Sequence, residues 1–562
     1  MPGNPSTIPS AVAKPAAMRE FSPAKKGNRF SRLESGFDEH SDLIAAFAVV
    51  SGFVWRLWLA HATFFNTDEA WHFFLANQGS AGQAYKASLT ISHPPLLILI
   101  LHFWRVLGTS ELVLRLPAVL AGTIFCWIFY KWLCLVAGRA TAWAGLILAA
   151  FLAPMIATSA DVRQNPLLLM FAAGTIYFFD RALADDSAPE MAGSSVCLYL
   201  AMLSHYSAFF VAGALGVYAI VRMLWQRPSS RVMLIWVAGQ VGGVALAGLL
   251  YKTHLGRLGS ILNQALLPQQ YLSTSYFHKG TDHLLPYLYR GTFGIFRFFV
   301  GQTQIGQVAA ILFVAGLIFL FASRDSESDS RKPRALGILL LLPFVLNWLA
   351  AAEGLYPYGR MRQCMFLGIF GLAGMSICLA RIANKRALVA AILAVGIVVL
   401  SHVFGTLQDR DAIPLAEQRR EHMDQALHFI RTEVSPNDVI FTDQATSYQL
   451  RHYLCDQKPV SMEVSPGGLE SFRCEAFRVV FTGPNDGALT AQSLDARWHD
   501  SDRRPDLNST AEHVWVVQGG WASGLGEELQ HVPGFTQIEV HPFGRYLEIF
   551  RLPTRLPRLA QG

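Results

Sequence analysis

The sequence predicts an α-helical polytopic membrane protein, with about eleven transmembrane helices, that carries a small C-terminal α/β domain. Charged residues make up only 15% of its 562 residues and hydrophobic residues 52%, whereas a soluble protein has roughly 25% charged residues. The mean hydropathy is +0.32, which is high for a chain of this length. Apolar runs recur up to about residue 405 and then give way to a polar, aromatic stretch. We therefore expect a membrane module at 43–405 and an extracytoplasmic domain at 406–562.

Residues 1–42 are expected to form a disordered cytoplasmic tail, because they are rich in Pro, Ser and Ala and lack apolar periodicity. The first apolar run, about Leu43–Phe65, has no small-residue cleavage site and is interpreted as an uncleaved signal anchor. Basic residues in the tail favour a cytoplasmic N-terminus. They are Lys14, Arg19, Lys25, Lys26, Arg29 and Arg32.

The remaining spans are predicted from further apolar runs, since a full span needs about 20 residues. Several of these runs are short, and 166–181 and 194–204 are the weakest predictions. The runs lie at about 117–135, 141–157, 166–181, 194–204, 207–221, 232–251, 305–323, 336–352, 361–380 and 388–405.

One apolar run, Pro94–Leu107, is too short to cross a membrane and is expected to lie along its outer face. With that choice Lys131, Arg139 and Arg181 face the cytoplasm, as the positive-inside rule favours. If the run crossed the membrane, the same basic residues would face outward. The favoured topology leaves these stretches outside: about 66–116, Asp161–Pro166, 252–304, Glu353–Arg362 and everything after Phe404.

The stretch after Phe404 alternates helical and strand patterns, which predicts a small α/β domain of roughly 150 residues. Helical patterns cover Pro414–Val434 and the region near Ser447–Leu454. Short strands are predicted at Val439–Thr442, Arg478–Thr482, His513–Val517 and Tyr546–Phe550.

Two cysteines, Cys455 and Cys474, lie outside the apolar segments, and both follow the last span. On the oxidising side of a membrane such a pair is expected to form a disulfide. The alternative is two free thiols buried in separate parts of the domain core.

Adjacent carboxylates, Asp68 and Glu69, follow the outer end of the first span. A carboxylate at a membrane boundary, beside apolar surface, is suited to act as a general base for a hydroxyl. The alternative is structural, because Thr67 or Asp68 as N-cap, followed by acidic residues, is typical of a helix N-terminus.

Three arginines on the predicted outer side are candidates for binding an anion. Arg163 opens a span, and Arg360 and Arg362 lie between two late spans, where positive charge runs against the positive-inside rule. Arginine binds phosphate through paired hydrogen bonds. The alternative is contact with lipid headgroups, with Tyr358 as part of an aromatic belt.

His93, His205 and Tyr206 are further candidates for binding a substrate, because each lies at an outer break between apolar runs. His93 precedes two prolines that start a helix, and it also fits a simple interfacial hydrogen-bonding role. His205 and Tyr206 also fit an ordinary turn.

We expect no metal or other cofactor, since the chain has no HExxH motif and its histidines lack metal-ligand spacing. The strings Asp409-Arg410-Asp411 and Asp500-Ser501-Asp502 are typical of solvated loops. Binding of a divalent metal by these acids is the alternative. The net charge of +6 lies mainly in short loops, so nucleic acid is not an expected partner.

Short motifs in order along residues 43–405 resemble the integral-membrane glycosyltransferases of the GT-C fold. The closest resemblance is to the bacterial glycosyltransferase 39 or RgtA/B/C/D-like group, related to protein O-mannosyltransferases and the lipid A aminoarabinose transferase. The chain departs from that pattern at Arg163–Pro166, where Arg-Gln-Asn-Pro replaces the commoner Arg-Pro-Tyr-Ala. The matching motifs are Thr67–Ala70, His93–Leu96, Leu114–Ala118 followed by Gly122, Asp161–Arg163, Ser204–Ala208 and Arg360–Arg362.

The resemblance implies a multi-pass enzyme of the inner (plasma) membrane that uses a polyprenyl-phosphate-linked sugar on the outer, periplasmic side. It implies that a hexosyl or pentosyl group passes, with inversion, to a lipid, glycan or protein hydroxyl, with Asp68 as the base. The main alternative is a transporter or flippase of lipid-linked sugars, which should carry ionisable residues inside its spans and paired broken helices. Most charges here lie at span boundaries, with Arg56 as an exception. A third interpretation, a binding module on a membrane anchor, does not account for so many spans.

Overall fold

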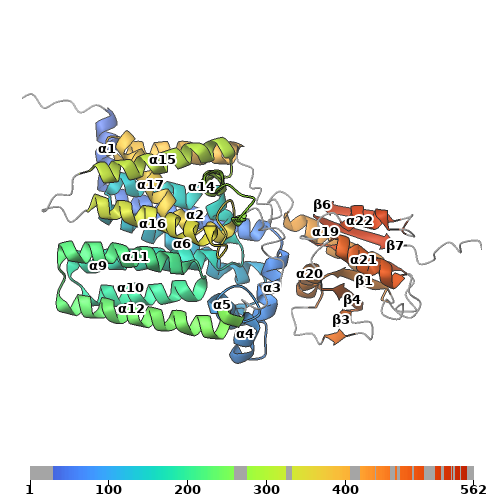
Figure 1. Cartoon of the computed structure of the whole chain (residues 1–562). Coiled ribbons are helices and arrows are strands. Elements are labelled where there is room, and N and C mark those ends of the chain that lie inside the picture. The colour runs from blue at the N-terminus through green and yellow to red at the C-terminus, as the bar shows by residue number, and fades with distance from the viewer. Residues whose placement is uncertain are drawn as a thin grey trace, which may run out of the picture.

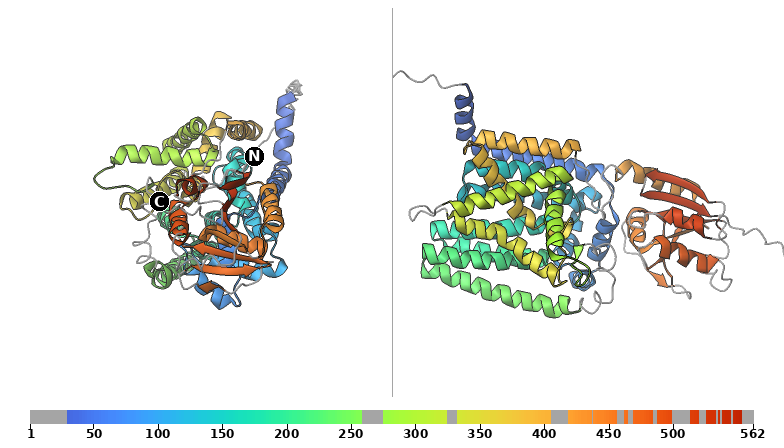
Figure 2. Two further views of the ribbon diagram at one scale, coloured as in Figure 1. Left: turned by 90° about the vertical axis from the view of Figure 1, so that its right-hand side faces the viewer. Right: turned by 45° about the horizontal axis from the view of Figure 1, so that its top comes forward.

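The protein, seen in a computed structural model, consists of a helical bundle and a smaller sheet domain that packs against one end of it (Figure 1). Two further views show the same arrangement (Figure 2). We call this end of the bundle the domain-facing end. The structure describes residues 29–257, 275–323, 332–404, 418–436, 438–455, 462–464, 469–483, 487–498, 513–519, 525–532, 535, 538–544 and 546–552.

Within these described residues, eight helices are long and apolar enough to cross a membrane. The number becomes nine if α7 (Arg139–Phe151) and α8 (Ala153–Ala160), which meet at a 53° bend, form one broken span. The eight are α2 (Ser41–Ala62), α6 (Glu111–Val136), α9 (Asn165–Asp185), α11 (Ala208–Gln226), α12 (Ser230–Leu250) with its extension Tyr251–Leu255, α15 (Thr303–Ala322), α16 (Pro333–Ala352) and α18 (Ala387–Phe404).

Three more of the described helices belong to the bundle. α10 (Ala188–Ser204) and α17 (Leu367–Ile382) correspond to two further predicted spans but have only 17 and 16 residues. Amphipathic α14 (Leu284–Val300) packs against α15. Every apolar run of the sequence is thus a helix or a broken pair of helices, and the predicted polytopic fold is confirmed.

The segment expected to be a disordered tail is helical from Arg29 onward, so that expectation is wrong for residues 29–42. Helix α1 spans Arg29–Glu39, and α2 begins at Ser41. The Phe37 ring packs on Trp143 with ring centroids 4.5 Å apart. Phe30, Leu33 and Phe37 recur at helical spacing, so this end of the polar tail does contain a short pattern that predicts a helix. Residues 1–28 lie outside the described part of the chain.

Three short helices gather at the domain-facing end: α3 (Thr67–Ala76), α4 (Ala81–Ser88) and α5 (Leu96–Trp104) (Figure 1). After α5, Arg105 donates a hydrogen bond of 2.7 Å back to the Gln78 carbonyl. α6 then begins at Glu111, which forms an ion pair with Arg420 of the sheet domain. The chain therefore enters and leaves α5 at the same end of the bundle, as the prediction that Pro94–Leu107 does not cross the membrane requires.

The charge inside the first span, Arg56, stabilises the break between α7 and α8. Its guanidinium donates to the carbonyls of Ala149 and Ala150, each at 3.0 Å. These carbonyls belong to the last turn of α7, where a helix leaves acceptors without partners. Arg56 is 1% exposed, so it caps a broken helix inside the bundle.

The C-terminal domain is a mixed sheet in the strand order β2-β3-β4-β1-β5-β7-β6. β1 is parallel to β4 and β5, and the other pairs are antiparallel. The predicted strands are present, whereas β2, β3 and β6 had not been predicted. The strands are β1 (Val439–Asp443), β2 (Glu463–Val464), β3 (Glu470–Cys474), β4 (Phe477–Thr482), β5 (Val514–Gln518), β6 (Glu539–Gly544) and β7 (Leu547–Leu552).

Helices cover both faces of this sheet. Alternate strand residues point to opposite faces, so each face contributes to a core of its own. Side chains of α19 (Arg420–Glu433) and α20 (Gln444–Leu454) share a core with Ile440 and Val479. Side chains of α21 (Gly487–Trp498) and α22 (Leu525–His531) share another core with Phe441 and Val480. The predicted α/β class of the domain is therefore confirmed.

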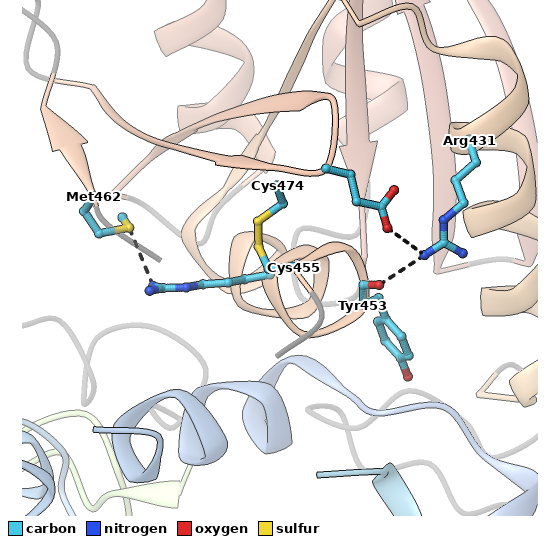
Figure 3. Close-up of a disulfide and its surroundings, with 7 residues drawn as sticks. Arg431, Tyr453, Cys455, Met462 and Cys474 are labelled. Atoms are coloured by element: carbon cyan, nitrogen blue, oxygen red, sulfur yellow. Dashed lines mark hydrogen bonds and ion pairs between the residues drawn. A yellow bond between two sulfur atoms is a disulfide. The ribbon is translucent and has the colours of Figure 1, made fainter. Parts of the chain in front are cut away.

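The predicted disulfide between Cys455 and Cys474 is present, with their Cα atoms 4.7 Å apart (Figure 3). It joins the C-terminal end of α20 to the end of β3.

Candidate active site

The predicted acidic pair lies in the first turn of α3. Asn66 is the N-cap, and its side chain accepts a hydrogen bond of 3.0 Å from the Glu69 N–H. The Glu69 carboxylate in turn accepts the Asn66 N–H at 2.9 Å, which completes a capping box. The helix N-terminus of the structural interpretation is therefore present, but its N-cap is Asn66 and not Thr67 or Asp68. The role of Asp68 as a base stays a prediction.

Asp68 meets two of the predicted arginines. Arg163 forms an ion pair with its Oδ2 atom, and Nη2 of Arg362 lies 3.4 Å from the same oxygen. Asp68 is 5% exposed and Arg163 is 7% exposed. Asp68 therefore lies against two guanidinium groups, which are side chains of the kind that bind anionic ligands.

Glu69 has different surroundings from its neighbour. Its two carboxylate oxygens accept bonds of 2.7 and 2.6 Å from Arg115, and Oε1 also accepts the Val162 N–H at 2.9 Å. The side chains of Glu69 and Arg115 are fully buried. The same guanidinium donates to the carbonyls of Ala60, Thr63 and Phe64 at the end of α2.

These contacts tie three segments together. The buried Glu69–Arg115 pair holds three segments in one arrangement. These are the α2–α3 connection, the start of α6 and the connection between α8 and α9. Val162 directly precedes Arg163, so the pair also fixes the backbone that brings Arg163 to Asp68.

Three histidines line the region beside Asp68. The His93 ring centroid lies 6.3 Å from that of His72 and 5.3 Å from that of His205. Nδ1 of His72 donates to the Asp68 carbonyl at 2.6 Å. His72 was not among the predicted residues, although its place one turn after Asp68 on the same helix face would have indicated it.

Burial keeps these imidazoles neutral. It lowers the pKa of His72 and that of His205 to about 4. Burial also holds the pKa of His93 well below its ordinary value, and the charges of the neighbouring histidines and Arg362 add to the effect. At neutral pH the three rings are therefore hydrogen-bonding groups without charge.

Asp161, next to Val162, differs from Asp68 in its electrostatics. Burial and the negative charge of Glu69 raise the pKa of the Asp161 carboxyl to about 7, against the opposing effect of Arg115 and Arg362. A carboxyl group that titrates near neutrality thus lies beside the Glu69–Arg115 pair.

Tyr206 and Tyr358, the remaining predicted residues, have hydrogen-bond partners of their own. The Tyr206 hydroxyl donates to Nδ1 of His254, whose Nε2 donates to the Ile91 carbonyl at 2.8 Å. The Tyr358 hydroxyl lies 2.8 Å from Oγ1 of Thr292.

Tyr358 also lines an apolar cavity of about 520 Å³ between α14, α15 and α16. Arg362 reaches Asp68, whereas Arg360 packs against Gly294 of α14. In the part of the chain that the structure describes, no group of three or more His, Cys, Asp or Glu side chains has the geometry to hold a metal ion.

Comparison with known proteins places this geometry in a known fold. Residues 92–252 match the model of the dolichyl-phosphate-mannose-protein mannosyltransferase family. Two crystal structures of ArnT from Cupriavidus metallidurans align along nearly the whole chain. The structure bound to undecaprenyl phosphate has 14% identity, a TM-score of 0.51 and coverage of 92% of this chain and 98% of ArnT. The chain has the GT-C glycosyltransferase fold.

The apo structure of the same ArnT gives a TM-score of 0.53 at 13% identity, with coverage of 91% of this chain and 98% of ArnT. No curated protein sequence matches this chain significantly. The family-model match includes His93, Arg163, His205 and Tyr206, so it covers several of the motifs on which the sequence resemblance rests. The relationship inferred from those motifs is confirmed.

Proposed function

We propose that this GT-C protein transfers a sugar from a polyprenyl-phosphate donor to a hydroxyl group of a lipid, glycan or protein acceptor. The observation that carries the proposal is the buried Asp68 carboxylate held between Arg163 and Arg362. Asp68 takes the proton of the acceptor hydroxyl as its oxygen attacks the anomeric carbon from the face opposite the leaving group. The bond from that carbon to the phosphate oxygen breaks, so the configuration inverts and polyprenyl phosphate leaves.

Arg163 and Arg362 stabilise the negative charge that develops on the leaving phosphate. Without a donor, Arg163 and Arg362 lie against the Asp68 carboxylate. A donor phosphate competes for the same N–H groups through charge-assisted hydrogen bonds. Binding of the donor thereby frees Asp68 to accept a proton, and we assign Arg360 to the phosphate as a third cation.

A lipid-linked donor is supported by the loop before α17. Tyr358 lines the apolar cavity between α14, α15 and α16, and Arg362, four residues later, reaches Asp68. One short segment thus joins an apolar surface to a cationic site, as an isoprenoid chain with a phosphate head requires. The ArnT structure of the same fold contains undecaprenyl phosphate.

The other predicted residues receive supporting roles. His93 and His205 are neutral donors and acceptors for sugar hydroxyls, and Tyr206 holds the start of α11 beside them. Glu69 is assigned a positioning role, because Arg115 and backbone N–H groups occupy both of its oxygens.

The proposal is tested by following the lipid product. The purified protein is reconstituted with lipid extract and envelope acceptors from a deletion strain, and released polyprenyl phosphate is measured by mass spectrometry. We expect Asp68→Asn to slow release by at least about 100-fold. The matched control is Asp42→Asn, an exposed acid that pairs with Lys131, which should behave as wild type.

Two outcomes contradict the proposal. If Asp68→Asn keeps more than about a tenth of the wild-type rate, Asp68 is not the general base. If the lipid-linked sugar crosses the vesicle membrane intact and no polyprenyl phosphate is released, the protein is a transporter.

A further inference from the structure

We propose that the C-terminal domain is a working part of the active site, because it fixes the α2–α3 connection that sets the position of Asp68. The residues that do this are Gln418, Gln449 and Tyr453. The kinetic part of the inference rests on the proposed function of Asp68, whereas the structural part does not.

The connection between α2 and α3 runs from Thr63 to Asn66, immediately before the acidic pair. It is extended, and Thr63 pairs with Arg419 as an isolated antiparallel bridge. The Phe64 N–H donates to the Gln418 carbonyl at 2.9 Å, and the Phe64 carbonyl accepts the Gln418 side-chain amide at 3.0 Å. A residue of the domain therefore satisfies both backbone groups of Phe64.

The next residue is held in the same way by α20. The Phe65 N–H donates to the Tyr453 hydroxyl at 2.8 Å and also to Oε1 of Glu111 at 3.2 Å. The Phe65 carbonyl accepts the Gln449 amide at 3.0 Å. Phe65 is fully buried, and buried backbone groups need partners. The Tyr453 hydroxyl also donates to Glu111 at the start of α6, so one side chain links the connection, the domain and the bundle.

Helix α20 also packs along α3 itself. The Tyr448 ring lies parallel to Trp71 at 6.3 Å and 5.1 Å from Phe74. The His452 ring stacks on Phe65 at 4.5 Å. Asp68 lies between Phe65 and Trp71 in the sequence, so contacts with the domain flank the carboxylate on both sides. A misplacement of about 1 Å can cost on the order of 100-fold in rate.

The end of α20 is fixed in turn to the sheet. Cys455, two residues after Tyr453, is bonded to Cys474 of β3 (Figure 3). Arg431 of α19 donates to the Tyr453 carbonyl at 3.4 Å and to Glu475 at 3.3 Å. The hydroxyl that holds Phe65 thus belongs to a helix end that is itself anchored.

The test compares the double variant Tyr453→Phe/Gln449→Met with the control Tyr199→Phe. Like that of Tyr453, the Tyr199 hydroxyl bonds a backbone group, but it donates to the Gly239 carbonyl and joins α10 to α12. We expect the double variant to lower kcat about tenfold or more with the donor KM within about twofold of wild type. Hydrogen exchange of the peptide covering Thr63–Trp71 should become faster. The control should change neither quantity.

The inference is overturned if the double variant keeps the wild-type kcat and the wild-type exchange of Thr63–Trp71. It is equally overturned if kcat falls only together with donor affinity and thermal stability, because that pattern reports general loss of structure. Should the wild-type protein show no transfer, the proposed function fails. Hydrogen exchange alone then decides whether the domain holds the connection.

Discussion

The buried pair of Glu69 and Arg115 makes a prediction that separates positioning from catalysis. Replacement of Glu69 by Gln removes the negative charge but keeps the size of the side chain. Arg115 then stays charged and fully buried, and the new amide presents donors to a guanidinium that is itself only a donor. Breaking a buried ion pair by removing one partner costs about 3–5 kcal/mol.

That loss is a large share of the stability of an ordinary protein, which is about 5–15 kcal/mol. Glu69→Gln should therefore lower both the thermal unfolding temperature and the rate of transfer. Asp68→Asn also removes a charge beside a buried arginine, Arg163, but its second partner Arg362 is partly exposed. We therefore expect Asp68→Asn to lose activity and to lower the unfolding temperature less than Glu69→Gln does.

The assay measures unfolding in detergent together with transfer per folded molecule. The matched control is Asp180→Asn, because Asp180 is another buried acid, bonded to Arg222, Tyr218 and Trp132 away from the site. It should lower stability while the rate per folded molecule stays unchanged, whereas Glu69→Gln should lower both. A Glu69→Gln protein as stable as wild type but inactive would refute the positioning role and make Glu69 a catalytic group.

Two further predictions concern charge. Arg362→Ala should raise the donor KM or lower kcat by about tenfold or more, since a hydrogen bond to a charged group contributes about 1.5–3 kcal/mol. If Arg360→Ala and Arg362→Ala both give the donor titration of the wild-type protein, these arginines contact lipids only. Acid should destabilise the fold between about pH 6.5 and 4, because the pKa values of His72 and His205 are lowered to about 4 and the unfolded chain then binds more protons. Stability is complete above that window and falls as pH drops through it, and unfolding temperatures of wild type and His205→Gln across this range should show a flatter dependence in the variant.

The parts of this structure that could be predicted from the sequence are those with a local signal. Hydropathy predicted the helices of the bundle, and strand and helix patterns predicted most elements of the sheet domain. The disulfide was predicted because Cys455 and Cys474 are isolated from the other cysteines. The meeting of Arg163 and Arg362 at Asp68 followed from placing all three on one side of the membrane. That argument required the short run Pro94–Leu107 to stay on one side.

The parts that were missed depend on contacts between distant segments. Tyr453 and Phe65 are 388 residues apart, and Arg115 and Glu69 are 46 apart. Hydrogen bonds to backbone groups leave no periodic pattern, so neither Tyr453 nor Gln449 carried a signal. The role of Arg56 could not be predicted for the same reason. A charge in an apolar run has no evident function until the structure shows the broken helix that it caps.

The distribution of basic residues over the two ends of the bundle predicts its orientation. The adjoining ends of the helix pairs α6/α7, α9/α10, α11/α12, α15/α16 and α17/α18 lie away from the sheet domain (Figure 1). There Arg139 bonds the Asp38 carbonyl, and Arg386 pairs with Glu34 of α1. Many of the described residues at these helix ends are basic, so the positive-inside rule predicts that this end is cytoplasmic. They include Arg139, Arg181, Arg222, Arg227, Arg231, Lys332, Arg334, Arg381, Lys385 and Arg386.

The sheet domain and Asp68 then face the outer side, where a Cys455–Cys474 bond is stable. Ser110→Cys, exposed at the domain-facing end, should react with an impermeant thiol reagent on intact cells. Ala184→Cys, exposed at the opposite end, should react only after the cells are permeabilised. The wild-type protein is the control, because it shows how far the native thiols react. The reverse pattern would put the disulfide and the proposed site in the cytoplasm. There the Asp68 chemistry would have to act on a cytoplasmic acceptor, and the basic connections would require another explanation than topology.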